Sequence, residues 1–423
     1  MKFHRIILSL IVFAAVAGHA ADPTATNYTM KECEGSLRPY PAPASQAQYP
    51  DSLVPVFINH VGRHGARYPA SSANCAKLAA ALSRADSLGT ITPLGRSLKA
   101  LNERVIARST NRWGALDSLG MSEQQGIAAR MYFNYRPVFE NGAVVQALSS
   151  YSPRAMMSMY SFTHQLDRMS NRITFTTSTG RINSGLMRPF DTVQSYLDFR
   201  RDKTWEPPYT EHFAKACPTT AIRRVLGEGY PFGNADEERD LAITEYYVVA
   251  GLRAMGMPSE MSTYFSTSEA NALWSCFNLR QYLQRTATTI SAIPADIASE
   301  LVLNLVQTTD DFIAGQNAAT TAVLRFGHAE TLMPLLSLLK IPGCYYLTNY
   351  FDTVAQHWCD FDVVPMAANI QFVLFKAKRS GRYYMRIELN ERPVQLRKGD
   401  NATIYPWGEV RRYMTDCVPI YAQ

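Results

Sequence analysis

The sequence predicts an α/β core that carries an inserted α-helical cap. Short β-rich runs occur on both sides of a long block, from about 200 to 310, in which strand patterns almost vanish. In that block, apolar residues recur with helical periodicity between turn-forming breaks. The β-rich runs are 53–58, 144–150, 322–326, 369–375 and 383–389. We therefore expect a core built from residues 21–199 and 311–423, with residues 200–310 as the cap.

The composition is that of a globular protein, since 47% of the 423 residues are hydrophobic and 18% are charged. The formal net charge is only +6, and the cations are spread along the chain, so we expect no nucleic-acid partner. The seven cysteines include no C-x-x-C pair, which disfavours structural zinc and a redox dithiol. We expect no metal and no cofactor. Cysteine pairing and oligomeric state stay open.

The N-terminal residues match a secretory signal peptide over residues 1–20. Lys2 and Arg5 supply positive charge, an apolar run extends from Ile6 to Ala17, and small residues follow at 18–20. The apolar run is short for a bilayer span, and no later segment has the roughly 18 apolar residues of a transmembrane helix. We expect an exported protein, periplasmic or secreted, without stable membrane insertion.

The elements before the cap begin with the strand 53–58, a Leu-Val-Pro-Val-Phe-Ile run that ends at polar residues. Helical patterns follow at 75–110 and 122–133, with Gly and Pro as breaks. A second strand at 144–150 leads into Ser152-Pro153-Arg154 and a Met-rich helix. The alternation of strand and helix is what an α/β core requires.

The remaining elements complete the cap and return to the core. The sequence predicts helices at 235–256, 268–289, 294–315 and 331–339, and strands at 322–326, 369–375 and 383–389. The last two strands face each other across residues 379–382, an Arg-Ser-Gly-Arg run that predicts a β-hairpin.

The run Arg63-His64-Gly65-Ala66-Arg67-Tyr68-Pro69 places two guanidiniums around one imidazole directly after the first strand. Arginine offers a planar fork of donors that suits phosphate oxygens, and its charge persists at any working pH. Gly65 lets the backbone come close to a ligand, and helix N-terminal amides near the run would add donors. A surface basic turn is the alternative. The strand end favours a ligand site, because α/β sheets bind ligands there.

A second motif, Gly327-His328-Ala329-Glu330, follows the strand 322–326 and opens the helix after it. Two strand-end motifs at one sheet edge can build a single pocket. In such a pocket His328 is a donor for phosphate. Glu330 is a candidate proton donor to a leaving alkoxide if burial raises its pKa toward the working pH. As the alternative, Glu330 is a first-turn acid that complements the helix dipole.

Together the two motifs resemble the histidine acid phosphatases, the large exported branch of the histidine phosphatase superfamily. The run from Arg63 to Pro69 matches the R-H-G-x-R-x-P pattern of that family. Most of this branch pairs it with a later His-Asp dipeptide. This sequence has His328-Ala329-Glu330 and a Leu-rich helix instead, which is similar to the multiple inositol polyphosphate phosphatases. The resemblance covers nearly the whole mature chain and implies a three-layer core like that of phosphoglycerate mutase, with a central mixed sheet.

The resemblance implies a role for each residue of the motifs. His64 is the expected nucleophile, which attacks phosphorus and forms a phosphohistidine. Arg63, Arg67 and His328 are expected to hold the scissile phosphate. Glu330 takes the place of the aspartate that donates the proton in His-Asp members, although it is one methylene longer and stands one position later.

Three further residues are assigned from their context. Arg154 stands at the start of the helix after a middle strand, among serines, and the resemblance implies that it joins the phosphate clamp. Arg188 and, less strongly, Arg181 are candidates for binding peripheral phosphates, with solvated arginines as the alternative. His60 is a satisfied core histidine, with a place at the pocket rim as its alternative.

These assignments predict an exported phosphomonoesterase whose substrates are small phosphorylated molecules, phytate and lower inositol polyphosphates. Phosphoryl transfer asks mainly for positioning and neutralisation of charge, which three arginines and one imidazole can supply. Two alternatives stay open. One is a broad acid phosphatase or sugar phosphatase of the same fold, and the other is a binding protein for phosphate esters that has lost turnover.

Overall fold

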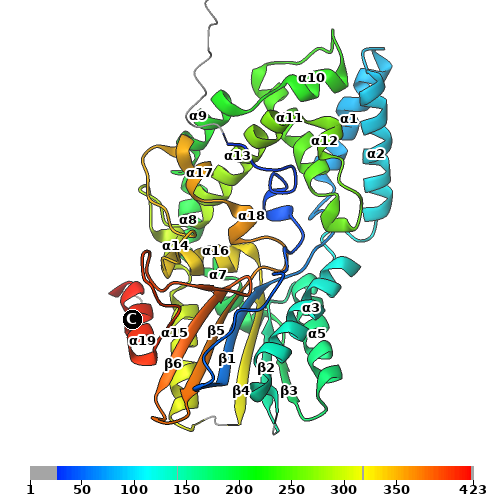
Figure 1. The fold of residues 1–423 in the computed structure, drawn as a ribbon. Helices are drawn as coiled ribbons and strands as arrows, with labels where there is room; N and C mark the ends of the chain where they lie inside the picture. Colours follow the sequence, from blue (N-terminus) through cyan, green and yellow to red (C-terminus); the bar gives the residue numbers. More distant parts are fainter. Residues whose placement is uncertain (1–25, 141, 317–318, 421–423) are drawn as a thin grey trace, which may run out of the picture.

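The strands form one mixed sheet, which occupies the lower half of Figure 1. The computed structural model describes residues 26–140, 142–316 and 319–420, so the predicted signal peptide lies outside the described residues. The eight strands are β1 Leu53–Arg63, β2 Val144–Ser149, β3 Thr174–Ser178, β4 Thr320–Gly327, β5 Asn369–Ala377, β6 Tyr383–Leu389, β7 Arg392–Val394 and β8 Ile404–Pro406.

The sheet is parallel on one side and antiparallel on the other. Its strand order is β3-β2-β4-β1-β5-β6-β7, and β8 pairs with β6. Strands β3, β2, β4 and β1 run parallel to one another. Strands β5, β6, β7 and β8 join by antiparallel pairing. Because β2, β4 and β1 are parallel neighbours, their carboxyl ends lie at the same edge of the sheet.

Helices cover both faces of the sheet, so the core has three layers. Neighbouring side chains of β1 point to opposite faces: Phe57 packs in one apolar cluster and Ile58 in another. Helices of the Ile58 cluster are α3 Ser118–Asn134, α4 Arg136–Phe139 and α5 Pro153–Met169. Helices of the Phe57 cluster include α6 Ser184–Met187, α7 Pro189–Thr192, α8 Gln194–Asp202, α14 Ile293–Asp296, α15 Ser299–Ile313, α16 Ala329–Leu338 and α19 Trp407–Cys417. This confirms the predicted α/β class with a central mixed sheet.

A helical layer forms the upper half of Figure 1. Its apolar cluster joins Leu82 and Leu98 to Leu241 and Trp274. The helices of this layer are α1 Ala73–Ser87, α2 Pro93–Ser109, α9 Glu206–Ala216, α10 Thr220–Leu226, α11 Ala235–Ala250, α12 Met261–Tyr264, α13 Thr267–Arg285, α17 Val354–His357 and α18 Asp360–Val363. The division into core and cap stays a proposal, and we propose to add α1 and α2 to the cap because they share its cluster.

The first strand is longer than predicted. The sequence places its end at Ile58, whereas β1 continues to Arg63. Asn59 and His60 are polar, but both are buried, and their backbones pair with β4 on one side and β5 on the other. The extension makes Arg63 the last residue of the strand and His64 the first residue beyond it.

Other elements differ mainly at their ends. The predicted helix 268–289 ends at Arg285, and the predicted helix 294–315 is divided into α14 and α15. The hairpin predicted across residues 379–382 is confirmed by the antiparallel pairing of β5 and β6. Strand β3 is not predicted by the sequence, because it is short, mostly exposed and lies at the sheet edge.

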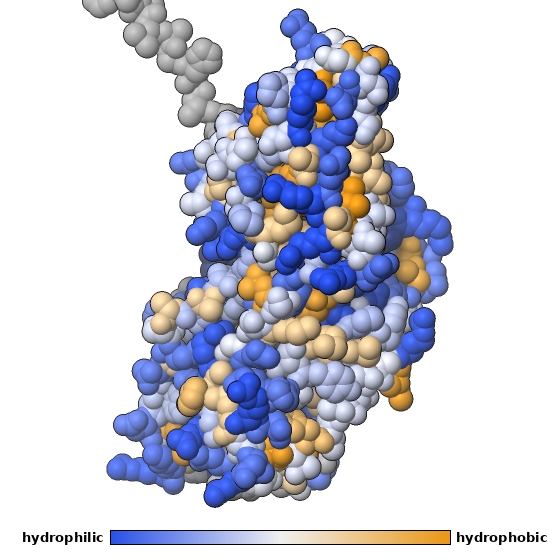
Figure 2. Space-filling model, turned by 90° about the vertical axis from the view of Figure 1, so that its right-hand side faces the viewer, coloured by the Kyte–Doolittle hydropathy of each residue, from blue (hydrophilic) through white to orange (hydrophobic). Residues whose placement is uncertain are grey.

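The surface carries mostly hydrophilic side chains on the face shown in Figure 2, with small and separated apolar patches. Such a face is typical of a surface in contact with water. None of the helices in the described ranges is long and apolar enough to cross a membrane.

Candidate active site

Three strand ends bring the predicted residues together. Strand β4 lies between β2 and β1, and the register pairs Arg63 with Gly327 and Ser149 with Phe326. The two motifs and the start of α5 therefore share one sheet edge, as the sequence predicts. A cavity of about 330 Å³ opens between this edge and helices α11 and α13, and its walls include Arg63, His64, Arg67, Arg154 and Glu330.

The His64 ring is almost fully buried just beyond the end of β1. Its Nδ1 lies 2.9 Å from the carbonyl oxygen of Gly65. Since a carbonyl oxygen only accepts, Nδ1 carries the proton and Nε2 keeps a free lone pair. Burial, and then the charges of Arg63 and Arg154, hold the pKa of His64 well below its usual range. His64 is therefore a neutral imidazole with a nucleophilic nitrogen.

Arg63 is fixed by hydrogen bonds to the backbone. Its Nη1 donates to the carbonyl oxygens of Ser36 at 2.6 Å and Val364 at 2.5 Å. Its backbone N–H donates to Ala368 O at 2.7 Å, and its backbone carbonyl accepts from Gln124 Nε2 at 2.9 Å. The guanidinium is thus held in place before a ligand arrives, which is the preorganisation that charge stabilisation requires.

Three arginines of the cavity have unused donors. The Nε atoms of Arg63, Arg67 and Arg154 are buried, and none of them has a hydrogen-bond partner among the described residues. Burial lowers the pKa of Arg63 to about 10. Burial and the charges of Arg154 and Arg63 lower the pKa of Arg67 to about 9. Because unpaired buried donors are costly and a bound anion satisfies them, this cluster is a prepared site for an oxyanion.

His328 precedes helix α16 and lies across the site from His64, with the ring centroids 5.6 Å apart. Its Nε2 is 2.9 Å from Ser150 Oγ and 2.9 Å from Arg188 Nη1. An arginine only donates, so Nε2 accepts and the ring proton sits on Nδ1. Burial lowers the pKa of His328 to about 3, with further lowering by Arg154 and Arg188. His328 is therefore neutral and retains one N–H donor.

Glu330 in the first turn of α16 is ionised, contrary to the pKa expected from the sequence. Its Oε1 lies 3.0 Å from Nη2 of Arg285, the last residue of α13. Burial raises the pKa of Glu330, but the charge of Arg285, the neighbouring His328 ring, the backbone N–H of Glu330 and the charge of Arg63 outweigh burial and hold it well below the usual range. The sequence gives no local pattern for Arg285, which comes from the cap.

Gly65 allows a close approach between two parts of the protein, and the expected approach to a ligand stays a prediction. A Cβ at this position would lie 2.3 Å from the carbonyl oxygen of Gly120 in α3. The helix after the motif run also begins only at Ala73, outside the run. The helices that begin at the site are α5 and α16.

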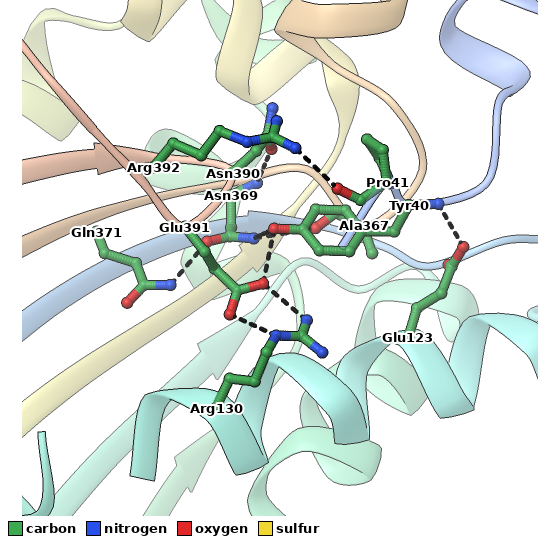
Figure 3. Close-up of polar contacts among 10 residues, drawn as sticks. All are labelled: Tyr40, Pro41, Glu123, Arg130, Ala367, Asn369, Gln371, Asn390, Glu391 and Arg392. Carbon is green, nitrogen blue, oxygen red and sulfur yellow. Dashed lines mark hydrogen bonds and ion pairs between the residues drawn. The ribbon is translucent and has the colours of Figure 1, made fainter. Parts of the chain in front are cut away.

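Helix α3 supports the motif run through Glu123. The Glu123 carboxylate accepts from the backbone N–H groups of Ala66 and Tyr40, both at 2.7 Å. Figure 3 shows how the Tyr40 side chain extends this network to Glu391, which accepts from Tyr40 OH at 2.8 Å and pairs with Arg130. The N-terminal segment, α3 and the turn after β6 are therefore joined beside the site.

Arg188 lies next to His328. Besides its contact with His328, its Nε is 2.6 Å from Asp191 Oδ2, and its guanidinium stacks 4.7 Å from the Tyr151 ring centroid. Arg181 stacks on the same ring at 4.5 Å. Binding of substrate by these two arginines stays a prediction.

The alternative placement of His60 at the pocket rim is wrong. The ring is buried between Phe162 and Phe326, with centroid distances of 5.3 and 5.2 Å. Burial lowers its pKa to about 3, so it is a neutral core residue. In the described part of the chain, no group of three or more His, Cys, Asp or Glu side chains is arranged to hold a metal ion.

The chain matches a model of a protein family. A family model described as the histidine phosphatase superfamily (branch 2) matches residues 200–390. This range contains His328 and Glu330, and it begins after Arg63 and His64.

Two curated relatives carry the same name. The chain is 23% identical over 395 residues to multiple inositol polyphosphate phosphatase 1 of Gallus gallus, a match that covers 90% of this chain and 85% of the relative. It is 25% identical over 227 residues to the Homo sapiens protein of that name, covering 51% of this chain and 46% of the relative.

Solved structures share the fold over nearly the whole chain. The apo form of the Bifidobacterium longum multiple inositol polyphosphate phosphatase has a TM-score of 0.78 at 18% identity, and the match covers 92% of this chain and 99% of that chain. The phytase from D. castellii has a TM-score of 0.70 at 17% identity, with 96% and 90% covered.

The family model and the curated relatives support a phosphomonoesterase, and the solved structures share its fold. The chain is related to branch 2 of the histidine phosphatase superfamily, which confirms the resemblance predicted from the two motifs.

Proposed function

We propose that the chain hydrolyses inositol polyphosphates, phytate included, through a phosphohistidine on His64. The main support is the arrangement of a neutral imidazole beside three arginines whose buried Nε donors are unused. Such a site binds a phosphate group and presents a nucleophile to its phosphorus. The substrate class is supported by the curated relatives, which are named for multiple inositol polyphosphates.

In the first step, the lone pair of His64 Nε2 attacks phosphorus and the bond to the ester oxygen breaks. The arginines Arg63, Arg67 and Arg154 neutralise charge on the equatorial oxygens, and the remaining N–H of His328 donates to one of them. A proton from Glu330 passes to the leaving oxygen, which departs as an alcohol. The phosphoryl group is then bonded to His64.

In the second step, water attacks the phosphohistidine. Glu330, now a carboxylate, accepts a proton from that water, the phosphorus–nitrogen bond breaks, and inorganic phosphate leaves. His64 returns to its neutral form with the Nδ1 proton still donated to Gly65 O. Each turnover thus consumes one water and restores every side chain.

A sugar phosphatase is the second candidate, and the far wall of the cavity favours it. Phytate carries roughly −9 to −12 charges at neutral pH, if each phosphate resembles a phosphoester. Arg63, Arg67 and Arg154 form the proposed phosphate clamp. Among the described residues that line the cavity, Arg285 is the one further cation, and it is paired with Glu330. The wall opposite carries uncharged side chains such as Leu37, Tyr247 and Phe277.

A time course of phosphate release from phytate and from glucose 1-phosphate, with separation of the inositol phosphate isomers, decides between the candidates. We expect faster release from phytate, with defined lower inositol phosphates as products. A large preference for glucose 1-phosphate would replace the inositol proposal by the sugar phosphatase. If neither ester is hydrolysed and phosphate still binds, the chain is a binding protein for phosphate esters that has lost turnover.

We also propose that the protein is exported. The support is the charged, apolar and small-residue pattern of residues 1–20. Determination of the mature N-terminus after expression in a secreting host tests this, since export predicts cleavage close to Ala20.

A further inference from the structure

Arg285 joins the cap to the proton donor of the proposed reaction. It is the last residue of α13, its side chain is 16% exposed, and it lines the cavity. Its Nη2 lies 3.0 Å from Glu330 Oε1, and its Nη1 donates to Gln281 Oε1 one turn earlier on the helix. Its Nε is buried and has no hydrogen-bond partner among the described residues. The guanidinium therefore contacts Glu330 through Nη2 and has an unused donor at Nε.

This ion pair conflicts with the proposed reaction as long as it persists. An ionised Glu330 has no proton for a leaving oxygen, and its negative charge repels a phosphate group. Glu330 is faced by Arg285 from α13, by His328 at the start of its own helix, by Arg63 and Arg67 from the motif run, and by Arg154 from α5. All of these except the neutral His328 carry positive charge, so these neighbours favour the ionised form of Glu330.

We infer that Arg285 exchanges partners when substrate binds: it leaves Glu330 and donates to a phosphate group, and Glu330 then takes up a proton from solvent. This inference rests on the proposed function. The bound phosphate also neutralises Arg63, Arg67 and Arg154, which removes most of the remaining attraction for a negative Glu330. The proton gained by Glu330 is the one that passes to the leaving oxygen, so the exchange supplies the acid only when a substrate is present.

The exchange is consistent with the geometry of a guanidinium. Its planar fork binds phosphate oxygens as readily as a carboxylate, so one side chain can serve both partners. Gln281 holds one Nη atom and leaves the Nε and the other Nη for either ligand. Arg285 lines the same cavity as Arg63, Arg67 and Arg154, so its donors and theirs face one space.

The pH dependence of Arg285→Gln tests the exchange. Removal of the cation raises the pKa of Glu330 in the free enzyme, so Glu330 stays protonated to a higher pH. We expect the alkaline fall of kcat/KM to move to higher pH in Arg285→Gln than in the wild type. Arg285→Lys keeps the charge without the fork and should retain a profile close to the wild type. An unshifted profile in an active Arg285→Gln would overturn the inference.

Binding of sulfate provides a second readout that needs no turnover. Sulfate resembles the phosphate group and does not titrate near neutral pH, so calorimetry in two buffers of different ionisation enthalpy reports protons taken up by the protein. We expect wild type to take up more protons than Glu330→Gln, and sulfate to bind Arg285→Gln roughly ten- to a hundredfold more weakly. The exchange would be overturned if Arg285→Gln bound sulfate as tightly as the wild type and Glu330→Gln took up as many protons as the wild type.

The controls separate this inference from the proposed function. Arg223→Gln removes an arginine that is paired with Glu238 on the outside of the cap, and it should leave both readouts unchanged. A wild type that hydrolyses no phosphate ester would contradict the proposed function, and the sulfate measurement would still test the exchange. A wild type with normal turnover and no effect of Arg285→Gln would contradict the exchange alone.

Discussion

Arg188 donates to His328: its Nη1 lies 2.9 Å from His328 Nε2, and this contact determines which ring nitrogen carries the proton. With Nε2 as acceptor, the N–H of His328 is at Nδ1. The proposed clamp uses this N–H as a phosphate donor. Arg188, which the sequence suggests for peripheral phosphates, thus lies beside His328, which belongs to the proposed clamp for the scissile phosphate.

Arg188→Gln should therefore lower kcat/KM by about tenfold. This is near the lower end of the usual effect of losing a hydrogen bond from a charged group. Without Arg188, the His328 proton can move to Nε2 and point at Ser150. Removal of this cation also raises the pKa of His328. Steady-state kinetics and nitrogen-15 chemical shifts of the histidine ring check both effects.

Two variants accompany this prediction. Arg188→Lys keeps a donor beside Nε2 and should restore most of the activity. Arg201→Gln removes an exposed arginine paired with Asp198 on α8 and should have no effect. Wild-type kinetics in Arg188→Gln would contradict the positioning role.

His64→Ala should abolish turnover while leaving the protein folded. Loss of a covalent nucleophile costs at least about a thousandfold in kcat, because no other side chain replaces the bond to phosphorus. Rapid quenching of the wild type with a labelled substrate should trap an acid-labile phosphoprotein, and His64→Ala should trap none. His164→Ala, at an exposed position of α5, is the matched control and should behave as wild type. Substantial turnover by His64→Ala would refute the nucleophile.

Much of the site could be predicted from the sequence because its residues stand at strand ends. Arg63 ends a largely apolar strand, His64 follows it, and His328 follows another strand, so topology alone brings them to one edge. The length of β1 was harder to predict, because Asn59 and His60 look like strand terminators. They are buried by neighbours that are distant in sequence, and local patterns do not report such neighbours.

The charge state of Glu330 could not be predicted for a similar reason. Burial alone would have raised the pKa of Glu330. The direction of this pKa shift is reversed mainly by Arg285, which stands 45 residues earlier and belongs to another helix. The end of α13 carries no motif that marks Arg285 as a site residue. Its position depends on how the cap packs against the sheet edge.

The pair of Arg130 and Glu391 should contribute strongly to stability. Figure 3 shows the two contacts of this pair, which measure 2.8 Å from Nε to Oε1 and 2.7 Å from Nη2 to Oε2. Glu391 is only 2% exposed at its side chain, so Arg130→Gln leaves a buried carboxylate without its cation. We expect the free energy of unfolding to fall by about 3 kcal/mol in denaturant titrations.

The control for this prediction is an exposed pair. Arg136→Gln removes the partner of Glu140 on the surface near α4 and should leave the midpoint of unfolding nearly unchanged, because exposed ion pairs contribute little. Equal effects of Arg130→Gln and Arg136→Gln would show that burial of Glu391 does not matter.

Glu245 should make the wild type less stable as the pH rises. It lies on α11, is fully buried, and neither carboxylate oxygen has a hydrogen-bond partner among the described residues. Burial raises its pKa from 4.5 to about 8. The folded protein therefore holds a proton that the unfolded chain releases above pH 4.5, so this group lowers stability between pH 4.5 and 8. At about 1.4 kcal/mol for each pH unit, the loss approaches roughly 5 kcal/mol.

Glu245→Gln removes this titration while keeping the shape of the side chain. The amide costs the same at every pH, so the stability of Glu245→Gln relative to the wild type should rise steadily between pH 5 and 8 in denaturant titrations. Glu228→Gln, at an exposed position after α10, should show a constant difference from the wild type over the same range. A constant difference for Glu245→Gln as well would mean that Glu245 ionises in the folded protein without a penalty, for instance through Arg224, whose charge lowers its pKa.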